Sequence, residues 1–242
     1  MVDDCKHSLS NAPILRAASF TIGYRMMLSD LIPSTVQSLV LFENSNEQYL
    51  AIMSTTTSRS QSLDLQNVLA MLSIQLRTLS ASLMADAGQF FDSCCSSLTW
   101  QNLTSLTLTS NLLSPSTDAN AVLQQGAEVA LRMPNLGIME IWNGGTELEA
   151  PFQYRPEPDP ITWKGTWDFR LLASTIHAWK AVAERRGTGL GVVHEIIDEN
   201  SVACLGDAIY YLGHLERVLR PVSLQQIRLE GASKVAHNQN DH

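Results

Sequence analysis

The sequence predicts an α/β protein in which short parallel strands stack one after another and helices run along the outside. Three observations support this prediction: a nine-residue pattern of apolar anchors that recurs, helix-like segments between the copies, and 33 leucines among 242 residues. Apolar residues make up 45% and charged residues 17%, as in a folded chain. We expect one domain over residues 1–230, followed by a polar, disordered tail over 231–242.

The anchor pattern is complete in Leu103–Asn111, which reads Leu-x-x-Leu-x-Leu-x-x-Asn, and Val36–Asn44 repeats it with valine in first place. Less complete copies begin at Leu15, Leu76, Leu136 and Leu224. From position 36 to position 136 the copies start 40, 27 and 33 residues apart, which leaves room for a helix after each strand. This recurrence is typical of leucine-rich repeats. The predicted fold is therefore an irregular leucine-rich-repeat-like solenoid, with strands on the concave face and helices outside.

Helical spacing of apolar residues predicts helices over 62–72 and 118–131, the second with Asp118 as its N-cap. No clean copy of the pattern lies between 136 and 224. The elements expected there are a proline-rich loop over 151–160, a strand over 166–171, a helix over 173–186 ended by Gly187, an apolar run over 190–193 and a helix over 202–219.

Alternation along the strands separates core residues from surface residues. In the complete copy, Leu106 and Leu108 point into the core and Thr107 points to the concave face, while Asn111 is expected to bond backbone groups at the turn. The same register in the other copies brings five larger side chains to the concave face, where aromatic residues are typical of recognition surfaces. We expect these five to contact a protein partner: Phe42, Ile138, Glu140, Trp142 and Arg228. The alternative is that a loop over 143–160 covers Phe42 and Trp142.

Bulk properties argue against several classes of protein. The net charge is −8 and no dense basic stripe is present, which disfavours nucleic-acid binding. No window approaches the roughly 20 apolar residues of a membrane span, and residues 1–7 do not resemble a secretory signal. The four cysteines show neither disulfide density nor zinc spacing. We therefore expect an intracellular protein, cytoplasmic or nuclear, with reduced thiols.

The sequence contains no catalytic or cofactor-binding motif with the expected spacing and structural context, so we expect neither an enzyme nor a cofactor or metal site. The glycines at 187, 189 and 191 lack the strand–turn–helix context of a dinucleotide site, and a helix C-cap explains Gly187 better. One alternative remains, a small-molecule-binding or catalytic accessory protein that uses region 143–220. Its candidate residues are His177, His194, Trp163, Trp167 and Trp179.

Several segments resemble a group of uncharacterised fungal F-box or leucine-rich-repeat-like proteins, over roughly residues 30–230. The resemblance rests on Trp163–Phe169, Ala178–Ala183, Gly206–Ile209, Arg220–Arg228, Leu79–Ala87, Phe90–Phe91 and Trp100–Leu106. In such proteins an F-box docks the Skp adaptor of a cullin ubiquitin ligase, and the repeats present a substrate. Nothing before Ser19 can house an F-box, and Leu31–Ser34 is only a short echo of its opening.

The resemblance implies a noncatalytic protein-recognition module, similar to the substrate-binding part of an F-box protein, with an unidentified protein partner. A second alternative is a shortened substrate receptor whose F-box lies upstream. Only in that case do we expect the Skp adaptor and a cullin as partners.

Overall fold

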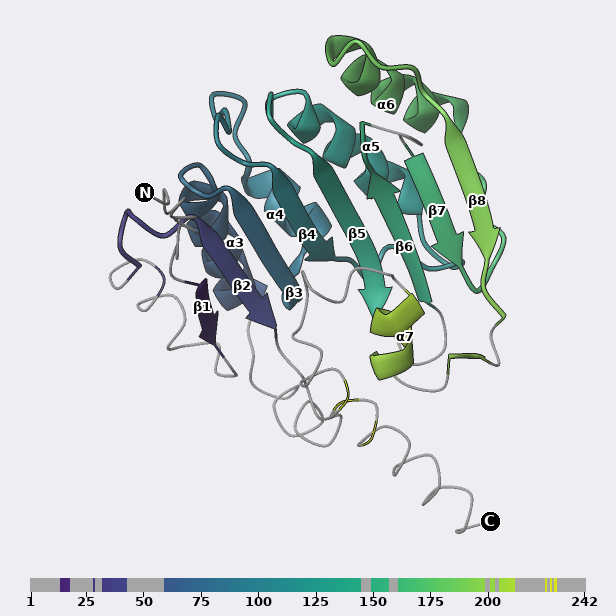
Figure 1. Ribbon diagram of the computed structural model, residues 1–242, viewed down its shortest axis with the longest axis horizontal. Helices are drawn as coiled ribbons and strands as arrows, with labels where there is room; N and C mark the ends of the chain where they lie inside the picture. The colour runs from purple at the N-terminus through teal and green to yellow at the C-terminus, as the bar shows by residue number, and fades with distance from the viewer. Residues whose placement is uncertain are drawn as a thin grey trace, which may run out of the picture.

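The computed structural model (Figure 1) describes residues 14–17, 28, 32–42, 59–144, 149–156, 161–198, 201–202, 205–211, 225, 227 and 229. Within these residues the chain forms a mixed α/β fold with one eight-stranded sheet, whose strands follow in sequence order. The strands are β1 Ile14–Ala17, β2 Ser38–Phe42, β3 Thr78–Asp86, β4 Ser105–Thr109, β5 Ile138–Gly144, β6 Glu149–Tyr154, β7 Ile161–Gly165 and β8 Val192–Ile196. The helices are α3 Arg59–Ser73, α4 Ala87–Ser93, α5 Ala119–Ala130, α6 Ala173–Arg185 and α7 Leu205–Tyr211.

The repeat copies at 36, 76, 103 and 136 form the parallel strands β2 to β5, as the sequence predicts. Their second and third anchors stand in register across the sheet and are fully buried. Because equivalent residues meet on neighbouring strands, two continuous apolar rows face the helices. The rows are Leu39, Leu79, Leu106 and Met139, and Leu41, Ala81, Leu108 and Ile141.

A forked backbone hydrogen bond recurs where β3, β4 and β5 begin. One carbonyl of the preceding repeat accepts two successive amides of the next repeat, which fixes the register before the strand starts. The Gln37 carbonyl accepts the amides of Arg77 (2.7 Å) and Thr78 (3.0 Å). The Arg77 carbonyl accepts the amides of Thr104 (2.8 Å) and Ser105 (3.1 Å), and the Thr104 carbonyl accepts those of Gly137 (2.8 Å) and Ile138 (3.0 Å).

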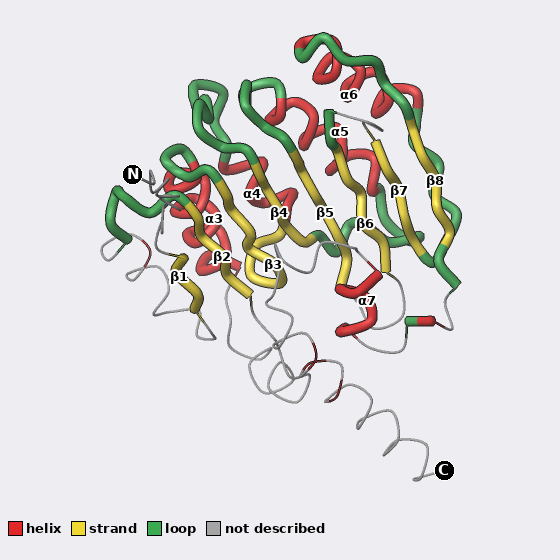
Figure 2. Tube along the Cα trace, in the orientation of Figure 1, coloured by secondary structure: helices red, strands yellow, loops and turns green. Residues whose placement is uncertain are grey.

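Helices α3, α4 and α5 pack behind the sheet and cover the apolar rows (Figure 2). The helix expected over 118–131 is confirmed as α5, and its predicted N-cap, Asp118, accepts the Ala121 amide at 3.3 Å. The helix over 62–72 is confirmed as part of α3. The sequence did not predict the short α4, where Asp86 caps the first turn by accepting the Gln89 amide at 3.2 Å.

The region after β5 differs from the expectation. The proline-rich loop predicted over 151–160 is wrong for its first residues, because β6 pairs antiparallel with β5 and with β7. Pro151 pairs with Trp142 of β5 but lies just outside the part of β6 that pairs with β7, at the end of that ladder, where proline is tolerated. The strand predicted over 166–171 is also wrong. Trp167 and Phe169 instead pack from an irregular segment against the Trp163 ring, at centroid distances of 5.5 and 4.3 Å.

The remaining expected elements have mixed outcomes. The helix over 173–186 is confirmed as α6, and Gly187 follows it with φ of 71° and donates its amide to the Glu184 carbonyl at 3.0 Å. The strand predicted at Leu224 is wrong, because the described residues there, Gln225, Ile227 and Leu229, are helical.

Two features of the repeat prediction itself also need correction. The first strand exists, but Leu15 pairs with Leu39, three residues away from the predicted register. Asn111 is exposed, and it is Asn143 that reaches across to the preceding turn, donating to the Leu113 carbonyl at 2.8 Å. The tail over 231–242 lies outside the described residues.

Polar side chains link successive turns behind the strand starts. The buried indole of Trp100 donates to the Ser73 hydroxyl at 2.6 Å, and Ser73 in turn donates to the Ala70 carbonyl. The Arg132 guanidinium lies 5.4 Å from the Trp100 ring and donates to the Cys94 carbonyl at 3.1 Å. Each turn is therefore tied to the next by side chains as well as by the sheet.

Replacing Ser73 by alanine should lower the free energy of unfolding by about 1–3 kcal/mol, because the buried Trp100 N–H loses its acceptor. Chemical denaturation measures the change. Ser93→Ala is the matched control, since Ser93 also donates to a carbonyl of its own helix, that of Gln89, and should change stability by less than about 0.5 kcal/mol. Equal effects of the two substitutions would contradict the assigned role of Ser73.

Candidate recognition surface

The face of the sheet opposite α3 to α5, here called the second face, carries the side chains that alternate with the buried leucines. One row across it runs along equivalent positions of β2 to β6. Unlike the apolar rows, it is mostly polar. Its members are Val40, Ser80, Thr107, Glu140 and Gln153.

The centre of the second face is buried and internally hydrogen-bonded. Gln153 Nε2 donates to Glu140 Oε2 at 3.1 Å, and Trp142 Nε1 donates to Ser82 Oγ at 3.3 Å. The Ser80 and Ser82 hydroxyls lie 3.5 Å apart. Since burial of polar groups is tolerated when they bond one another, this layer serves as a second, polar interior of the molecule.

Helix α7 packs over part of this face. It contacts β5, and its Ala208 and Ile209 are buried. Figure 1 shows α7 in front of the ends of β5 and β6, on the side away from α3 to α5. The helix predicted over 202–219 is present as α7 in part of its described range. It packs over the second face, however, and not on the face covered by α3 to α5, where the predicted solenoid would place its helices.

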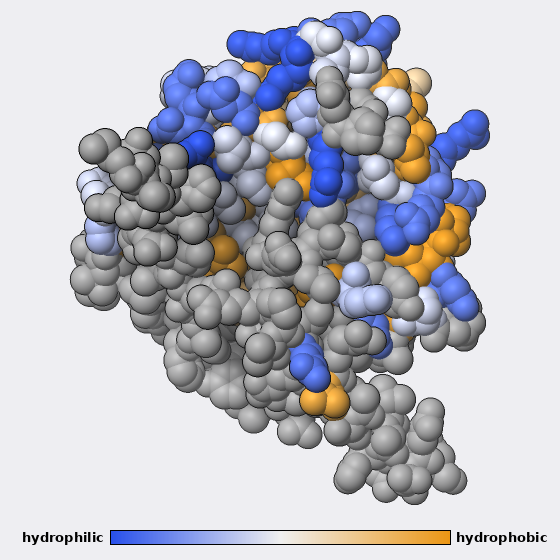
Figure 3. Space-filling view, viewed as in Figure 1, coloured by the Kyte–Doolittle hydropathy of each residue, from blue (hydrophilic) through white to orange (hydrophobic). Residues whose placement is uncertain are grey.

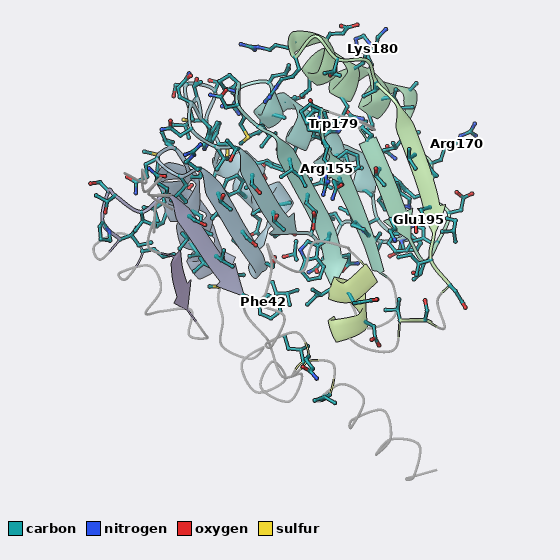
Figure 4. The ribbon with its side chains drawn as sticks, in the orientation of Figure 1. Phe42, Arg155, Arg170, Trp179, Lys180 and Glu195 are labelled. Carbon is teal, nitrogen blue, oxygen red and sulfur yellow. The ribbon has the colours of Figure 1, made fainter. Side chains whose placement is uncertain are left out.

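The five residues expected to contact a protein partner differ in how far they are exposed to solvent. Ile138, Glu140 and Trp142 are 4%, 0% and 0% exposed, so the expectation that they line an open face is wrong. Phe42 is half-buried at the end of β2 (Figure 4), and Arg228 lies outside the described residues. The alternative cover for Trp142, a loop over 143–160, is also wrong in its described part, because β6 lies beside Trp142 and pairs Pro151 with it.

The second face is accessible at its two flanks. On β2, the side chains of Ser38, Val40 and Phe42 are half-buried while the leucines between them are fully buried. At the opposite flank, Lys164 of β7 forms an ion pair with Glu195 of β8 at 2.8 Å. A partner that approaches this face meets an apolar flank on β2 and a charged flank on β7 and β8.

The two candidate histidines of region 143–220 are exposed, whereas its tryptophans Trp163 and Trp179 are fully buried. His177 lies on α6, and His194 lies on β8, in register with Trp163 of β7. Trp179 is fully buried, donates to the Leu123 carbonyl at 3.0 Å and packs against Phe152 at 5.1 Å. Among the described residues, no three His, Cys, Asp or Glu side chains gather as a metal site would require.

Two neighbouring pairs of titratable groups show shifted pKa values. Burial raises the pKa of the Cys94 thiol to about 12, while a hydrogen bond from Ser97 lowers the pKa of the exposed Cys95. Burial also raises the pKa of Tyr154 and lowers the pKa of Arg186, and each group partly offsets the other's shift. Cys94 is therefore a buried, protonated thiol.

The geometry defines a class of protein, a mixed α/β chain with a sequentially ordered sheet, with α3 to α5 on one face and α7 on the other. Residues 31–220 match the model of a family of unknown function (DUF6546), and the chain belongs to that family. No curated protein and no solved structure matches it. None of the helices in the described part of the chain is long and apolar enough to cross a membrane.

Replacing Trp142 by alanine should destabilise the fold by about 3–5 kcal/mol, because it empties a fully buried site. Trp142→Phe keeps an aromatic ring at the site but loses the bond to Ser82 and leaves a smaller cavity than alanine does, so its cost should be intermediate, about 1–3 kcal/mol. Urea unfolding followed by circular dichroism measures both variants. An alanine variant with wild-type stability would contradict the interior position of Trp142.

Proposed function

We propose that the protein is a noncatalytic protein-recognition module, and that its strands and helices belong to an irregular leucine-rich-repeat-like solenoid. The observation that carries the proposal is the register of β2 to β5, in which four repeat copies align anchor by anchor. Arrays of this kind offer an extended surface, and they bind by complementarity across several repeats. The resemblance to fungal F-box proteins agrees with this role and makes a ligase substrate receptor the alternative form of the same proposal.

Within this proposal, the partner contacts the β2 flank. Phe42 offers a large apolar ring that the chain leaves half-buried, and Val40 lies beside it on the same face. Partly exposed aromatic side chains are frequent binding hot spots, because a partner removes their remaining surface from water. Arg228 remains a proposed contact. Ile138, Glu140 and Trp142 would then support the surface from beneath and not touch the partner.

The polar side chains described on the second face are better suited to supporting a binding surface than to catalysis. Its hydroxyl, amide and carboxylate groups bond one another, so their orientation is fixed by the fold. A general base or nucleophile has to reach a substrate, and the hydroxyls of Ser80 and Ser82 and the carboxylate of Glu140 are buried. We place the module inside the cell, where Cys94 and the exposed Cys95 remain free thiols.

The test is affinity purification of the tagged protein from its own host, with quantitative mass spectrometry. Phe42→Ala should reduce recovery of the specific partners by about tenfold, as expected for loss of a hot spot. Met71→Ala is the control, since Met71 is an exposed apolar residue on α3 behind the sheet, and recovery should be unchanged.

Identical partner recovery with both variants would contradict the proposed surface. If the Skp adaptor and a cullin are recovered with the wild type, the ligase form of the proposal is favoured. A specific partner set without them favours a free-standing recognition module.

A further inference from the structure

Strand β8 ends the sheet and is exposed along its whole length. In the part of the chain that the structure describes, its one neighbour is β7 (Figure 1). Val192 and Val193 are each 38% exposed and Ile196 is 57% exposed. Figure 3 shows hydrophobic surface along this edge, at the right of the view. An exposed edge strand with apolar side chains is a template for pairing with another strand.

The backbone of β8 shows which groups are available for such pairing. Gly191 accepts the Ile161 amide at 3.1 Å, and Ile197 donates to the Gly165 carbonyl at 2.8 Å, so both residues direct their polar groups toward β7. In a strand the N–H and C=O of one residue point to the same side, and this side alternates along the chain. The N–H and C=O groups of Val192, His194 and Ile196 therefore point away from the sheet.

We infer that β8 pairs with β8 of a second copy of this chain, antiparallel, with a two-fold axis at His194. His194 then lies opposite its own counterpart, and Val192 lies opposite Ile196 of the other copy on both sides of the axis. All three outward N–H groups and all three outward C=O groups gain partners. The two sheets join into one continuous sheet across the dimer.

A second copy fits this edge because the strand is self-complementary. Val192 of one copy lies opposite Ile196 of the other copy, and the backbone groups of both residues point outward. Cross-strand pairs of β-branched residues such as these stabilise a sheet. Glu195 is the charged residue of β8, and it is already paired with Lys164 of its own chain at 2.8 Å. In the antiparallel register it lies opposite Val193, so no like charges face each other.

Two-fold pairing also closes the assembly. Each copy uses the same edge, so a dimer consumes both β8 edges and no further copy can add there. Because each chain carries a net charge of −8, the two copies repel one another at a distance. Moderate salt screens this repulsion and should strengthen the dimer. The inference does not depend on the proposed recognition role, since Phe42 lies on β2, toward the other end of the sheet (Figure 4).

Sedimentation of the full chain over a range of concentrations tests the inference. The 26.7 kDa chain should approach twice that mass as concentration rises. His194→Pro removes an outward N–H that β7 does not use, and should weaken dimerisation by at least about tenfold. His194→Ala keeps that N–H and should leave the dimer within about twofold of the wild type. Circular dichroism checks that each variant is folded.

A second pair of variants keeps the test decisive if the proline variant does not fold. Ile196→Lys should also abolish the dimer, because it places a charge opposite Val192 of the other copy. Met71→Lys is its matched control, since Met71 is 59% exposed, close to the 57% of Ile196, and should have no effect. A wild-type chain that stays monomeric at all concentrations would overturn the inference. A dimer that survives both His194→Pro and Ile196→Lys would overturn it equally.

Discussion

The forked hydrogen bond at the start of β3, β4 and β5 is the interaction on which the rest of the structure depends. Where one carbonyl receives two successive amides, as Arg77 does from Thr104 and Ser105, the next strand can begin in only one register. That register aligns the leucine anchors, and aligned anchors need helices behind them. The helix lengths follow the spacing of the copies: α3, α4 and α5 have 15, 7 and 12 residues over intervals of 40, 27 and 33.

The same register gives the sheet a second interior that is polar. Alternation places hydroxyls opposite the leucines, and on β3 to β5 these side chains are buried and bond one another through Ser82, Trp142 and their neighbours. In the described part of the sheet, the accessible regions are β2, next to β1 at one end, and the edge strand β8 at the other end. The centre between these two regions is buried. The proposed partner contact and the proposed dimer contact follow from this division.

Sequence reasoning predicted the elements that rest on short-range periodicity. The anchors of β2 to β5 and their register were readable because each copy repeats apolar residues two apart, and α5 was readable from its spacing and from Asp118. The pairing of β6 with β5 was not, because Pro151 normally argues against a strand and its tolerance depends on where the β7 ladder begins. The burial of Trp142 was not predictable either, since it depends on where a distant segment such as α7 packs. Local patterns determine which side of a strand a residue faces, but only tertiary packing decides whether that side is open.

Methyl nuclear Overhauser contacts between the leucines of β2, β3 and β4 test the central claim, the in-register repeat array, most directly. The account predicts contacts of Leu79 with both Leu39 and Leu106, its partners on the two neighbouring strands. Matching contacts should join Leu106 to Met139 on β5. Contacts that place Leu79 opposite Leu41, two residues away, or no contacts between these strands, would contradict the shared register and with it the proposed repeat architecture.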